Sequence, residues 1–277
     1  MTDERSPATD DESRTTDGLN LGIGTYDVDP DRCEAAVATA LACGYRHVDT
    51  AEMYDTETAV GRALERADVP RESVVVATKI HSQNLEYDSV IEHARACRDR
   101  LGLDAIDLLY VHWPIRSYDP TETLAAFDEL YDRGAIRNVG VSNFRPAQLE
   151  TAIDILEAPL FAHQVECHPL LPQDELRRLA RAYDHHLVGY SPLAKGRVLE
   201  LAELDEIASA YDATPAQISL AWLEAKGVVP IPKSTSEAHI RENIAARSIE
   251  LDRDDVDRID RIDRTERVVD FPDAPWN

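Results

Sequence analysis

Lysine is almost missing from this chain, whose 277 residues include only Lys79, Lys195, Lys226 and Lys233. Asp and Glu number 53 against 29 Lys and Arg, which gives a formal net charge of −24. Proteins that bind nucleic acid present a basic face to the phosphates, and no basic cluster occurs here. We therefore exclude nucleic acid as a partner. Because Lys is avoided elsewhere, each of the four is a candidate for a specific role.

Long apolar runs are also lacking, since no stretch approaches the roughly 20 residues that a membrane-spanning helix needs. The first residues are acidic and polar, whereas a secretory signal begins basic and continues apolar. The cysteines Cys33, Cys43, Cys97 and Cys167 are scattered without a C-x-x-C pair, which argues against structural zinc and a disulfide scaffold. We expect a cytoplasmic protein that binds no membrane.

The acidic residues are distributed along the whole chain. Such a surface destabilises the compact state by self-repulsion at low salt, a property that halophilic proteins exploit. The hypothesis that follows is a halophile-like acidic surface and a requirement for high salt. Residues 1–17 are charged, rich in Asp, Ser and Thr, and show no apolar period, so we expect a disordered acidic tail before a single domain at 18–277.

Strand-like and helix-like patterns alternate along this domain. Strands are predicted at 45–48, 74–77, 106–111, 136–141, 162–166, 187–190, 228–231 and 247–250, and 19–26 is predicted as a short strand or hairpin. Helices are predicted at 29–43, 56–67, 88–101, 121–133, 146–156, 174–185, 201–211, 214–226, 236–246 and 252–264. No Pro- or Gly-rich linker divides them. The pattern and length favour one (β/α)8 barrel, with a doubly wound open sheet as the alternative.

In a barrel, polar residues that follow the strands converge on one mouth. Asp49 ends the first of the eight strands, Tyr54 lies in the loop after it, Lys79 ends the second and His112 ends the third. Each residue alone could be a helix cap, a solvated strand end or a rim residue. Their occurrence on consecutive strands favours a shared catalytic site.

The four side chains also form a chemically sensible set. A phenol titrates near pH 10, and a neighbouring ammonium stabilises its phenolate form. We expect Lys79 to lower the pKa of Tyr54, Asp49 to hold Lys79 charged, and His112 to hydrogen-bond a substrate oxygen or the phenol. Such a site can protonate a carbonyl oxygen as it becomes an alkoxide.

Several motifs strengthen this interpretation. Residues 44–54 read Gly-Tyr-Arg-His-Val-Asp-Thr-Ala-Glu-Met-Tyr, and they are followed by Thr78-Lys79, Val111-His112-Trp113-Pro114, Gly140-Val141-Ser142-Asn143-Phe144, Gln164-Val165-Glu166-Cys167-His168-Pro169, Tyr190-Ser191-Pro192-Leu193 and Ile231-Pro232-Lys233-Ser234. In this order the chain resembles the aldo-keto reductase family, particularly its small prokaryotic, diketogluconate-reductase-like members. The resemblance covers essentially everything after the acidic tail.

The resemblance implies a (β/α)8 barrel that binds NAD(P)H at its C-terminal mouth and reduces small aldehydes, 2-oxoaldehydes or keto-sugars to alcohols. By matching motif, Tyr54 is the proton donor, Lys79 and Asp49 tune it, and His112 positions the carbonyl. The implied cofactor residues are Gly24, Thr25, Ser142, Asn143, Gln164, Tyr190, Ser191, Pro192, Leu193, Ile231, Lys233, Ser234, His239, Glu242 and Asn243. By the resemblance, Ser142, Asn143 and Gln164 would hold the nicotinamide carboxamide, and Tyr190 would stack on the ring. Ser191 and Leu193 would lie along the pyrophosphate, Lys233 and Ser234 would contact the adenosine ribose and its 2′-phosphate, and Glu242 and Asn243 would lie near the adenine.

One position departs from the family pattern. His239 stands where the family has a phosphate-binding arginine, and Arg241 lies two positions further on. A neutral imidazole grips a 2′-phosphate less well than a guanidinium fork. Because Lys233 is kept, we expect NADPH, with NADH or dual use left open.

Two aromatic residues, Tyr26 and Trp113, are the predicted substrate-binding residues. Phe271 and Trp276, near the C-terminus, are further candidates for the substrate wall, although simple packing of the chain end on the barrel would also explain them. We expect a monomer that acts on a small-molecule carbonyl substrate.

Two rival functions remain. A metal-dependent hydrolase could use His47, Asp49 and His112 as ligands, but the later strand ends offer amides and hydroxyls, so we expect no metal and place His47 in the barrel interior. A nucleotide-binding regulatory barrel would not need all four candidate catalytic residues. A Rossmann fingerprint is weak, because Gly22-Ile23-Gly24 lacks the third glycine.

Overall fold

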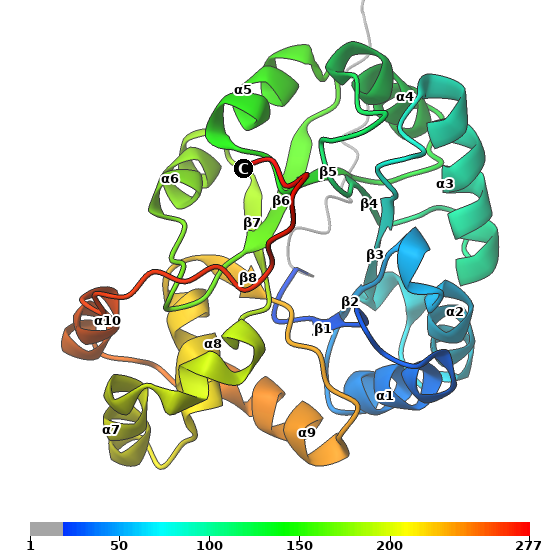
Figure 1. Cartoon of the computed structure of the whole chain (residues 1–277). Coiled ribbons are helices and arrows are strands. Elements are labelled where there is room, and N and C mark those ends of the chain that lie inside the picture. The colour runs from blue at the N-terminus through cyan, green and yellow to red at the C-terminus, as the bar shows by residue number, and fades with distance from the viewer. Residues whose placement is uncertain (1–18) are drawn as a thin grey trace, which may run out of the picture.

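The computed structural model describes residues 19–277, so the predicted disordered tail lies outside the described residues. In this part of the chain, strands alternate with helices (Figure 1). The strands are β1 Ile23–Gly24, β2 His47–Asp49, β3 Val75–Ile80, β4 Leu108–Val111, β5 Val139–Ser142, β6 Leu160–Glu166, β7 His186–Tyr190 and β8 Val228–Pro230. The α-helices are α1 Pro30–Ala42, α2 Glu57–Arg66, α3 Tyr87–Leu101, α4 Pro120–Asp132, α5 Pro146–Ile155, α6 Asp174–Ala182, α7 Ala202–Ala210, α8 Pro215–Ala225, α9 Glu237–Ala245 and α10 Arg253–Asp260.

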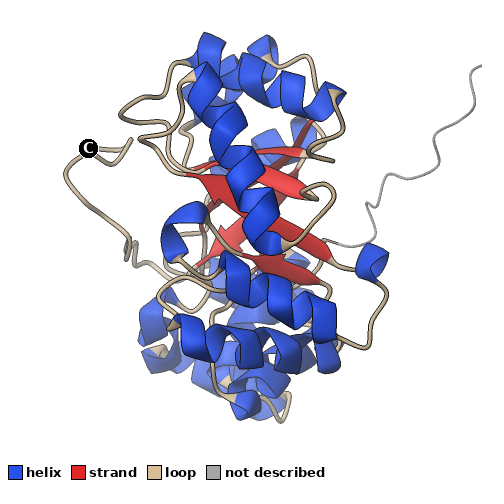
Figure 2. Cartoon of the chain, turned by 90° about the vertical axis from the view of Figure 1, so that its right-hand side faces the viewer, coloured by secondary structure: helices blue, strands red, loops and turns tan. Residues whose placement is uncertain are grey.

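The strands form one parallel sheet in chain order, from β1 to β8. The sheet closes because the backbone N–H of Gly22 donates to Pro230 O at 2.9 Å and that of Gly24 donates to Pro232 O at 3.1 Å. Helices surround the strands on the outside (Figure 2). The predicted single (β/α)8 barrel is therefore confirmed, and the open-sheet alternative is wrong.

Local sequence explains where several helices begin and end. Asp29 caps α1 by accepting a hydrogen bond from Asp31 N at 2.9 Å, and Pro30 occupies the first turn. Thr214 and Gln217 form a reciprocal capping box at the start of α8. Gly44 follows α1 with a φ of +102°, a conformation that glycine adopts without strain. These signals explain why the predicted helix boundaries lie close to the observed ones.

The predicted last strand, residues 247–250, is wrong. Residues Ala246–Ser248 form a 3₁₀ turn, and Arg247 pairs with Glu224 on α8 at 3.6 Å. This segment lies outside the barrel because β8 already has β7 on one side and β1 on the other, so no strand edge remains for it. The eight strands are complete only when β1, within the predicted strand or hairpin at 19–26, is counted as the first.

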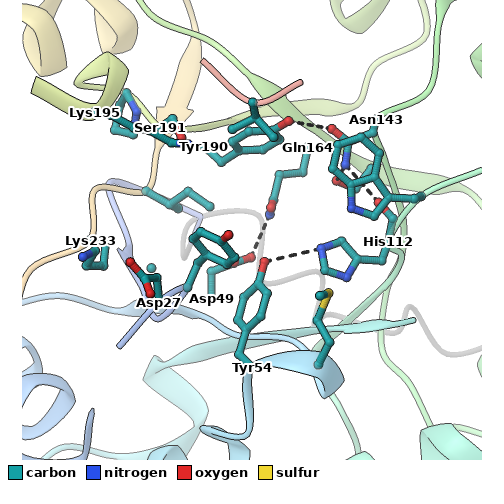
Figure 3. Close-up of a pocket in the computed structure, with 18 of the residues that line it drawn as sticks. Asp27, Asp49, Tyr54, His112, Asn143, Gln164, Tyr190, Ser191, Lys195 and Lys233 are labelled. Atoms are coloured by element: carbon teal, nitrogen blue, oxygen red, sulfur yellow. Dashed lines mark hydrogen bonds between the residues drawn. The ribbon is translucent and has the colours of Figure 1, made fainter. Parts of the chain in front are cut away.

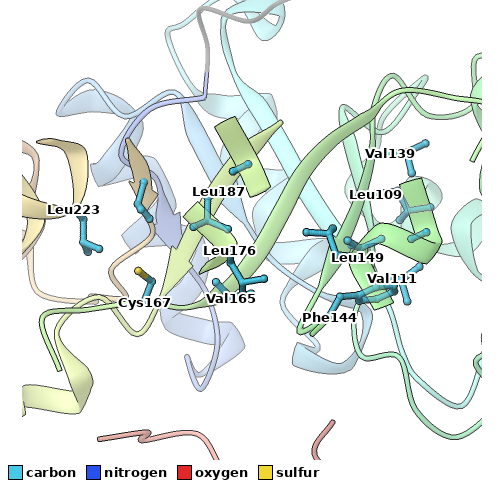
Figure 4. Close-up of a cluster of buried hydrophobic side chains, with 14 of the residues drawn as sticks. Leu109, Val111, Val139, Phe144, Leu149, Val165, Cys167, Leu176, Leu187 and Leu223 are labelled. Atoms are coloured by element: carbon cyan, nitrogen blue, oxygen red, sulfur yellow. The ribbon is translucent and has the colours of Figure 1, made fainter. Parts of the chain in front are cut away.

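The core has an inner and an outer layer. Inside the barrel, Val75, Leu108, Tyr110 and Val188 are buried together with Leu19. The outer layer fills the space between strands and helices and is the larger one (Figure 4). Strand residues such as Leu109, Val111, Val139, Val165 and Leu187 face helix residues such as Leu149, Leu176 and Leu223 there. Burial on both faces explains the continuous apolar runs of the strands.

After α10, the chain from residue 261 to Asn277 runs back over one end of the barrel (red in Figure 1, at the left of the barrel in Figure 2). We call this stretch the C-terminal segment. Among the described residues, no helix has both the length and the apolar composition needed to span a bilayer. The described cysteines are all free thiols, as the scattered spacing predicts.

Candidate active site

A cavity of about 810 Å³ opens at the carboxyl ends of the strands, and we call it the mouth cavity (Figure 3). Its lining comes from the carboxyl ends of the strands, from the loops after β1, β2, β3, β4, β5, β7 and β8, and from the C-terminal segment. Among the predicted site residues, those that line it are Gly24, Tyr26, Asp49, Tyr54, His112, Trp113, Ser142, Asn143, Gln164, Tyr190, Ser191, Pro192, Leu193, Ile231 and Lys233. Residues distant in sequence are thus gathered at one place.

Asp49 and Lys79 form a buried ion pair beneath this cavity. Lys79 Nζ donates to Asp49 Oδ1 and also to Thr50 O at 2.7 Å, and both side chains are almost fully buried. Parallel pairing of β2 with β3 brings the two residues together. Burial lowers the pKa of Lys79, and the Asp49 carboxylate opposes that effect. Lys79 does not line the cavity itself. Its charge acts on the site through its two neighbours, the Asp49 carboxylate and the Tyr54 ring.

Tyr54 lies on the short 3₁₀ turn Glu52–Tyr54 that follows β2. Its hydroxyl is 3.4 Å from His112 Nε2 (Figure 3). Lys79 Nζ lies 5.2 Å from the centroid of its ring. Glu52 fixes the turn, because its carboxylate accepts from His81 N at 2.9 Å and pairs with His93. The phenol is thereby held between the ion pair and the imidazole.

The predicted lowering of the Tyr54 pKa is wrong. Burial raises the pKa of Tyr54 well above its usual value, and the negative charge of Asp49 raises it further. Asp49 lies against Lys79 and offsets the positive charge that was expected to stabilise the phenolate. Tyr54 therefore keeps its proton at neutral pH.

His112 follows β4 and is buried. Burial lowers its pKa well below the usual value, and the positive charge of Lys79 acts in the same direction. The ring is therefore neutral near pH 7, and its Nδ1 atom has no hydrogen-bond partner within the described residues. The backbone at this point is held by Asn143, whose Nδ2 donates to His112 O at 3.0 Å.

A row of amide and hydroxyl groups lines the opposite wall (Figure 3). Gln164 Nε2 donates to Asp49 Oδ2 at 2.7 Å, and the Tyr190 hydroxyl donates to Asn143 Oδ1 at 2.8 Å. Asn143 Nδ2 also lies 3.0 Å from Ser142 Oγ. These bonds hold the polar side chains at the ends of β5, β6 and β7 in place, and Gln164 connects this wall to the Asp49–Lys79 pair.

The loop after β7 has an unusual backbone. Ser191, Ala194 and Lys195 all have φ near +50°, and Gly196 has φ of +94°. Left-handed conformations are unfavourable for residues with a Cβ atom, so the surrounding structure must hold this loop in place. Lys195 and Lys233 are exposed and line the mouth cavity, and neither forms an ion pair with any described residue.

Some predicted cofactor residues lie outside the cavity lining. Thr25 is buried, and its hydroxyl donates to Asp49 O at 3.1 Å. Glu242 accepts from Thr214 Oγ1 at 2.6 Å on the neighbouring helix. Ser234 and His239 lie near the start of α9 and Asn243 lies in its last turn, and none of the three lines the cavity. Arg241 is bound to Glu237 at 2.8 Å, which agrees with its exclusion from the predicted site.

Aromatic residues form the other end of the cavity. The ring of Tyr26 lies 5.2 Å from that of Tyr54, and Trp113 lies 4.8 Å from Phe271 and 5.6 Å from Trp276. Phe271 lines the mouth cavity, whereas Trp276 packs behind Trp113.

The position of the C-terminal segment depends on Glu166, which the sequence interpretation gave no role. This buried carboxylate at the end of β6 accepts from Val268 N at 2.6 Å and from Val269 N at 2.8 Å. It also lies 2.9 Å from His168 Nε2. A buried carboxylate that accepts several hydrogen bonds is well satisfied, so Glu166 anchors the segment that completes the cavity wall.

Other lining residues carried no recognised motif. They include His81, Arg116, Lys195 and Val269. Lys195 could have been singled out because lysine is scarce in this chain. The other three follow a strand or the last helix, and no sequence motif around them indicates that they line a cavity.

The rival metal site is not supported. His47 is buried within the barrel, as predicted, with Nδ1 3.3 Å from Asn20 O. A Cβ atom on Gly22 would lie 2.6 Å from this ring, so the glycine makes room for it. No three His, Cys, Asp or Glu side chains within residues 19–277 come together in a way that could hold a metal ion.

Comparison with known proteins gives a consistent result. Residues 18–264 match the family described as the Aldo/keto reductase family. An aldo-keto reductase of Mycolicibacterium smegmatis (strain ATCC 700084 / mc(2)155) is 38% identical over 237 residues, which are 85% of this chain and 86% of that protein. The methylglyoxal reductase DkgB of Escherichia coli O157:H7 is 35% identical over 238 residues, 85% of this chain and 89% of its own length.

Solved structures agree with these relatives. The crystal structure of a protein provisionally named 2,5-diketo-D-gluconic acid reductase B superposes with a TM-score of 0.89 at 32% identity, covering 92% of this chain and 91% of that one. The predicted resemblance to diketogluconate-reductase-like proteins is therefore confirmed.

Proposed function

The chain belongs to the aldo/keto reductase family, and we propose that it is an NADPH-dependent reductase that converts aldehydes and ketones to alcohols, with the proton supplied by Tyr54. Enzymes of this family use nicotinamide cofactors and act on small-molecule carbonyl compounds. The observation that carries the proposal is that Tyr54, His112 and Asp49 line one end of the mouth cavity, with Lys79 directly beneath them, bound to Asp49 and next to the Tyr54 ring.

The rest of the cavity suits a nicotinamide dinucleotide. Ser142, Asn143 and Gln164 offer amide and hydroxyl groups that can bind a carboxamide, and the half-buried ring of Tyr190 offers a flat surface beside them. Lys195 and Lys233 provide positive charge for phosphate groups in a chain that otherwise has an excess of acid. The cofactor, when bound, supplies a hydride to the carbonyl carbon.

Tyr54 and His112 can share one substrate oxygen. Their Oη and Nε2 atoms are 3.4 Å apart, so an oxygen placed beside both lies within hydrogen-bond distance of each. A neutral His112 can donate one hydrogen bond to this oxygen, while Tyr54 holds the proton to be transferred. An alkoxide is a stronger base than a phenolate, so a phenol with a raised pKa still donates its proton to it.

The ion pair acts after proton transfer. The phenolate left on Tyr54 would be stabilised by the Lys79 ammonium, whose Nζ lies 5.2 Å from the ring centroid. Asp49 holds this ammonium in place and also orients Gln164. In this proposal Lys79 stabilises the product of proton transfer and does not lower the pKa of Tyr54 beforehand.

NADPH is proposed over NADH because Lys233 is exposed and has no ionic partner among the described residues that would compete with a 2′-phosphate. His239 is also exposed, but it lies beyond the cavity lining. We therefore expect a preference for NADPH over NADH that is smaller than it would be with an arginine at position 239. The names of the relatives suggest 2-oxoaldehydes and keto-sugars as substrates.

Tyr54→Phe tests the assignment. The substitution removes the transferable proton and leaves the ring, so kcat should fall by about 10²–10⁴-fold. The Kd for NADPH, measured by fluorescence titration, should stay within about twofold, because Tyr54 belongs to the substrate end of the cavity.

Tyr183→Phe is the matched control. Tyr183 is exposed at the end of α6, so this substitution also removes a phenol hydroxyl but does so away from the cavity. A Tyr54→Phe variant that retains wild-type kcat would contradict the proposed proton donor. Tight NADPH binding by the wild type without oxidation in the presence of any aldehyde or keto-sugar would favour a regulatory nucleotide-binding protein instead.

A further inference from the structure

We propose that Glu52 is a positioning residue for proton transfer, and that its carboxylate sets the distance between Tyr54 and His112, the two groups that meet the substrate oxygen. The inference rests on the proposed function and extends it to a residue outside the cavity wall. Glu52 does not line the mouth cavity, so it acts on the reaction only through the groups that it holds.

The turn that carries Tyr54 is too short to hold its own shape. It comprises the three residues Glu52–Tyr54, and the N–H of Tyr54 donates to Ala51 O at 3.0 Å. Asp55 follows with a φ of +56°, a conformation that is unfavourable for a residue with a Cβ atom. Because a single helical turn fixes several backbone angles for one hydrogen bond, it is unstable in isolation. Contacts from other elements must therefore stabilise it.

Glu52 provides such contacts through both oxygens of its carboxylate. Oε2 accepts from His81 N at 2.9 Å, and Oε1 accepts from Asn84 Nδ2 at 3.0 Å and contacts His93 Nδ1. The first two partners belong to the loop after β3, and His93 lies on α3. The Glu52 side chain is only 13% exposed, and hydrogen bonds to a carboxylate that water barely reaches are strong ones. One side chain thus fastens the turn to two other elements of the barrel.

The loop after β3 is in turn bound to the segment that carries His112. The N–H of His112 donates to Ile80 O at 3.2 Å, at the end of β3. Further along, Ser117 donates from its N–H to Ser82 O at 3.1 Å and from its hydroxyl to Gln83 O at 2.8 Å. The loop after β3 therefore lies between the turn and the loop after β4, and it fixes the position of one relative to the other.

These links control the distance between the two side chains that meet the substrate. Tyr54 Oη and His112 Nε2 are 3.4 Å apart (Figure 3), which lets one oxygen lie beside both. Hydrogen bonds weaken steeply as their geometry departs from the ideal, and a displacement of about 1 Å can slow a reaction by about 10²-fold. Without Glu52, we expect the turn to shift and to carry the phenol away from the imidazole. The opposite wall of amide and hydroxyl groups has hydrogen bonds of its own and should stay in place.

The rate of hydride transfer tests this proposal. Stopped-flow absorbance follows NADPH oxidation in a single turnover with para-nitrobenzaldehyde, so that product release does not mask the chemical step. Glu52→Ala should lower this rate by about 10²-fold, whereas the Kd for NADPH should stay within about twofold, because the opposite wall is intact. Glu52→Gln keeps the shape and an oxygen acceptor for His81 N, so its rate should fall by only about fivefold, the equivalent of one hydrogen bond.

Repeating Glu52→Ala in the Tyr54→Phe variant separates positioning from a general loss of structure. With no hydroxyl to position, the second substitution should change the remaining rate by less than about threefold. A further loss of about 10²-fold would mean that Glu52 supports the fold of the whole site, and it would overturn the proposal.

Glu34→Ala is the matched control, because this carboxylate also binds other side chains, Arg62 and Arg66, but lies on α1 away from the cavity. The control variant should keep the wild-type rate. A wild-type rate in Glu52→Ala, or a Glu52→Gln variant as slow as Glu52→Ala, would also overturn the proposal while leaving the proposed function intact. A wild-type rate in Tyr54→Phe would instead contradict the proposed function itself.

Discussion

Burial decides the protonation of the individual groups in this protein, as Tyr54 and His112 illustrate. Both are pushed toward their neutral forms by desolvation. A neutral phenol and a neutral imidazole make a site that is ready to donate at pH 7. The same effect acts on His163, a histidine that has no part in the proposed reaction.

His163 should make folding sensitive to acid. It lies on β6 with no exposed surface, and its ring is 6.3 Å from that of His185. Burial, with a contribution from His185, lowers the pKa of His163 to about 3. The unfolded chain binds the proton near pH 6.5, so stability is complete above that pH and falls as the pH drops toward 3.

The loss attributable to His163 should reach about 2–3 kcal/mol between pH 7 and pH 4.5. Urea unfolding of wild type and His163→Leu at both pH values measures it, and the variant should lose less stability on acidification. His239→Gln is the control, because His239 is exposed. Identical pH dependence in wild type and His163→Leu would contradict the expected effect of burial.

Sequence patterns predicted which side chains gather at the mouth, but not how deeply each is buried. Tyr54, Lys79 and His112 were recognisable because they follow consecutive strands. The sign of the Tyr54 pKa shift was wrong because it depends on desolvation and on the distance between Asp49 and Lys79, which no spacing in the sequence contains. Glu166 was missed because its role depends on two backbone N–H groups of the C-terminal segment, about a hundred residues further along the chain.

Among the elements, helices with strong end signals were the easiest to predict. Pro30 and Gly44 bracket α1, and Pro215 and Gly227 bracket α8. The strands in the middle of the chain were also recognisable, because burial on both faces gives continuous apolar runs. These elements are specified by residues that lie close together in the sequence.

The first strand was harder to predict, since β1 is only two residues long and is defined by pairing with β2 and with residues 230–233. Such pairing joins segments about two hundred residues apart, so local patterns cannot reveal it. The stretch 247–250 has a suitable local pattern but no free strand edge. The left-handed backbone of the loop after β7 was also not predictable, because three of its four left-handed residues are not glycine.

For the whole molecule, the excess of acid is the dominant physical property. The described surface carries many Arg–carboxylate pairs, such as Arg62 with Glu34 and Arg258 with Glu206. Exposed pairs of this kind contribute little each, and with 53 acidic residues against 29 basic ones, at least 24 carboxylates have no cation to pair with one to one. We propose that the chain is halophile-like in this respect and depends on salt to screen the repulsion.

Thermal unfolding should therefore depend on KCl. Raising KCl from low-millimolar to molar concentrations should increase Tm, and a gain of about 2 kcal/mol would shift it by about 4–8 °C. Screening shortens the range of repulsion to about 3 Å at molar salt. Circular dichroism melts at several KCl concentrations measure the effect, with equimolar sucrose as the control for solute exclusion. A Tm independent of KCl would contradict the hypothesis.

Transfer of a labelled hydride tests the proposed carbonyl reduction most directly. Wild-type protein in molar KCl is incubated with an aldehyde and NADPH deuterated at both positions of nicotinamide C4, and the product is analysed by mass spectrometry. The account predicts an alcohol with one deuterium on the former carbonyl carbon, and the same reaction with unlabelled NADPH in D₂O should leave that carbon unlabelled. Absence of the alcohol, or an alcohol without deuterium from the labelled cofactor, would contradict it.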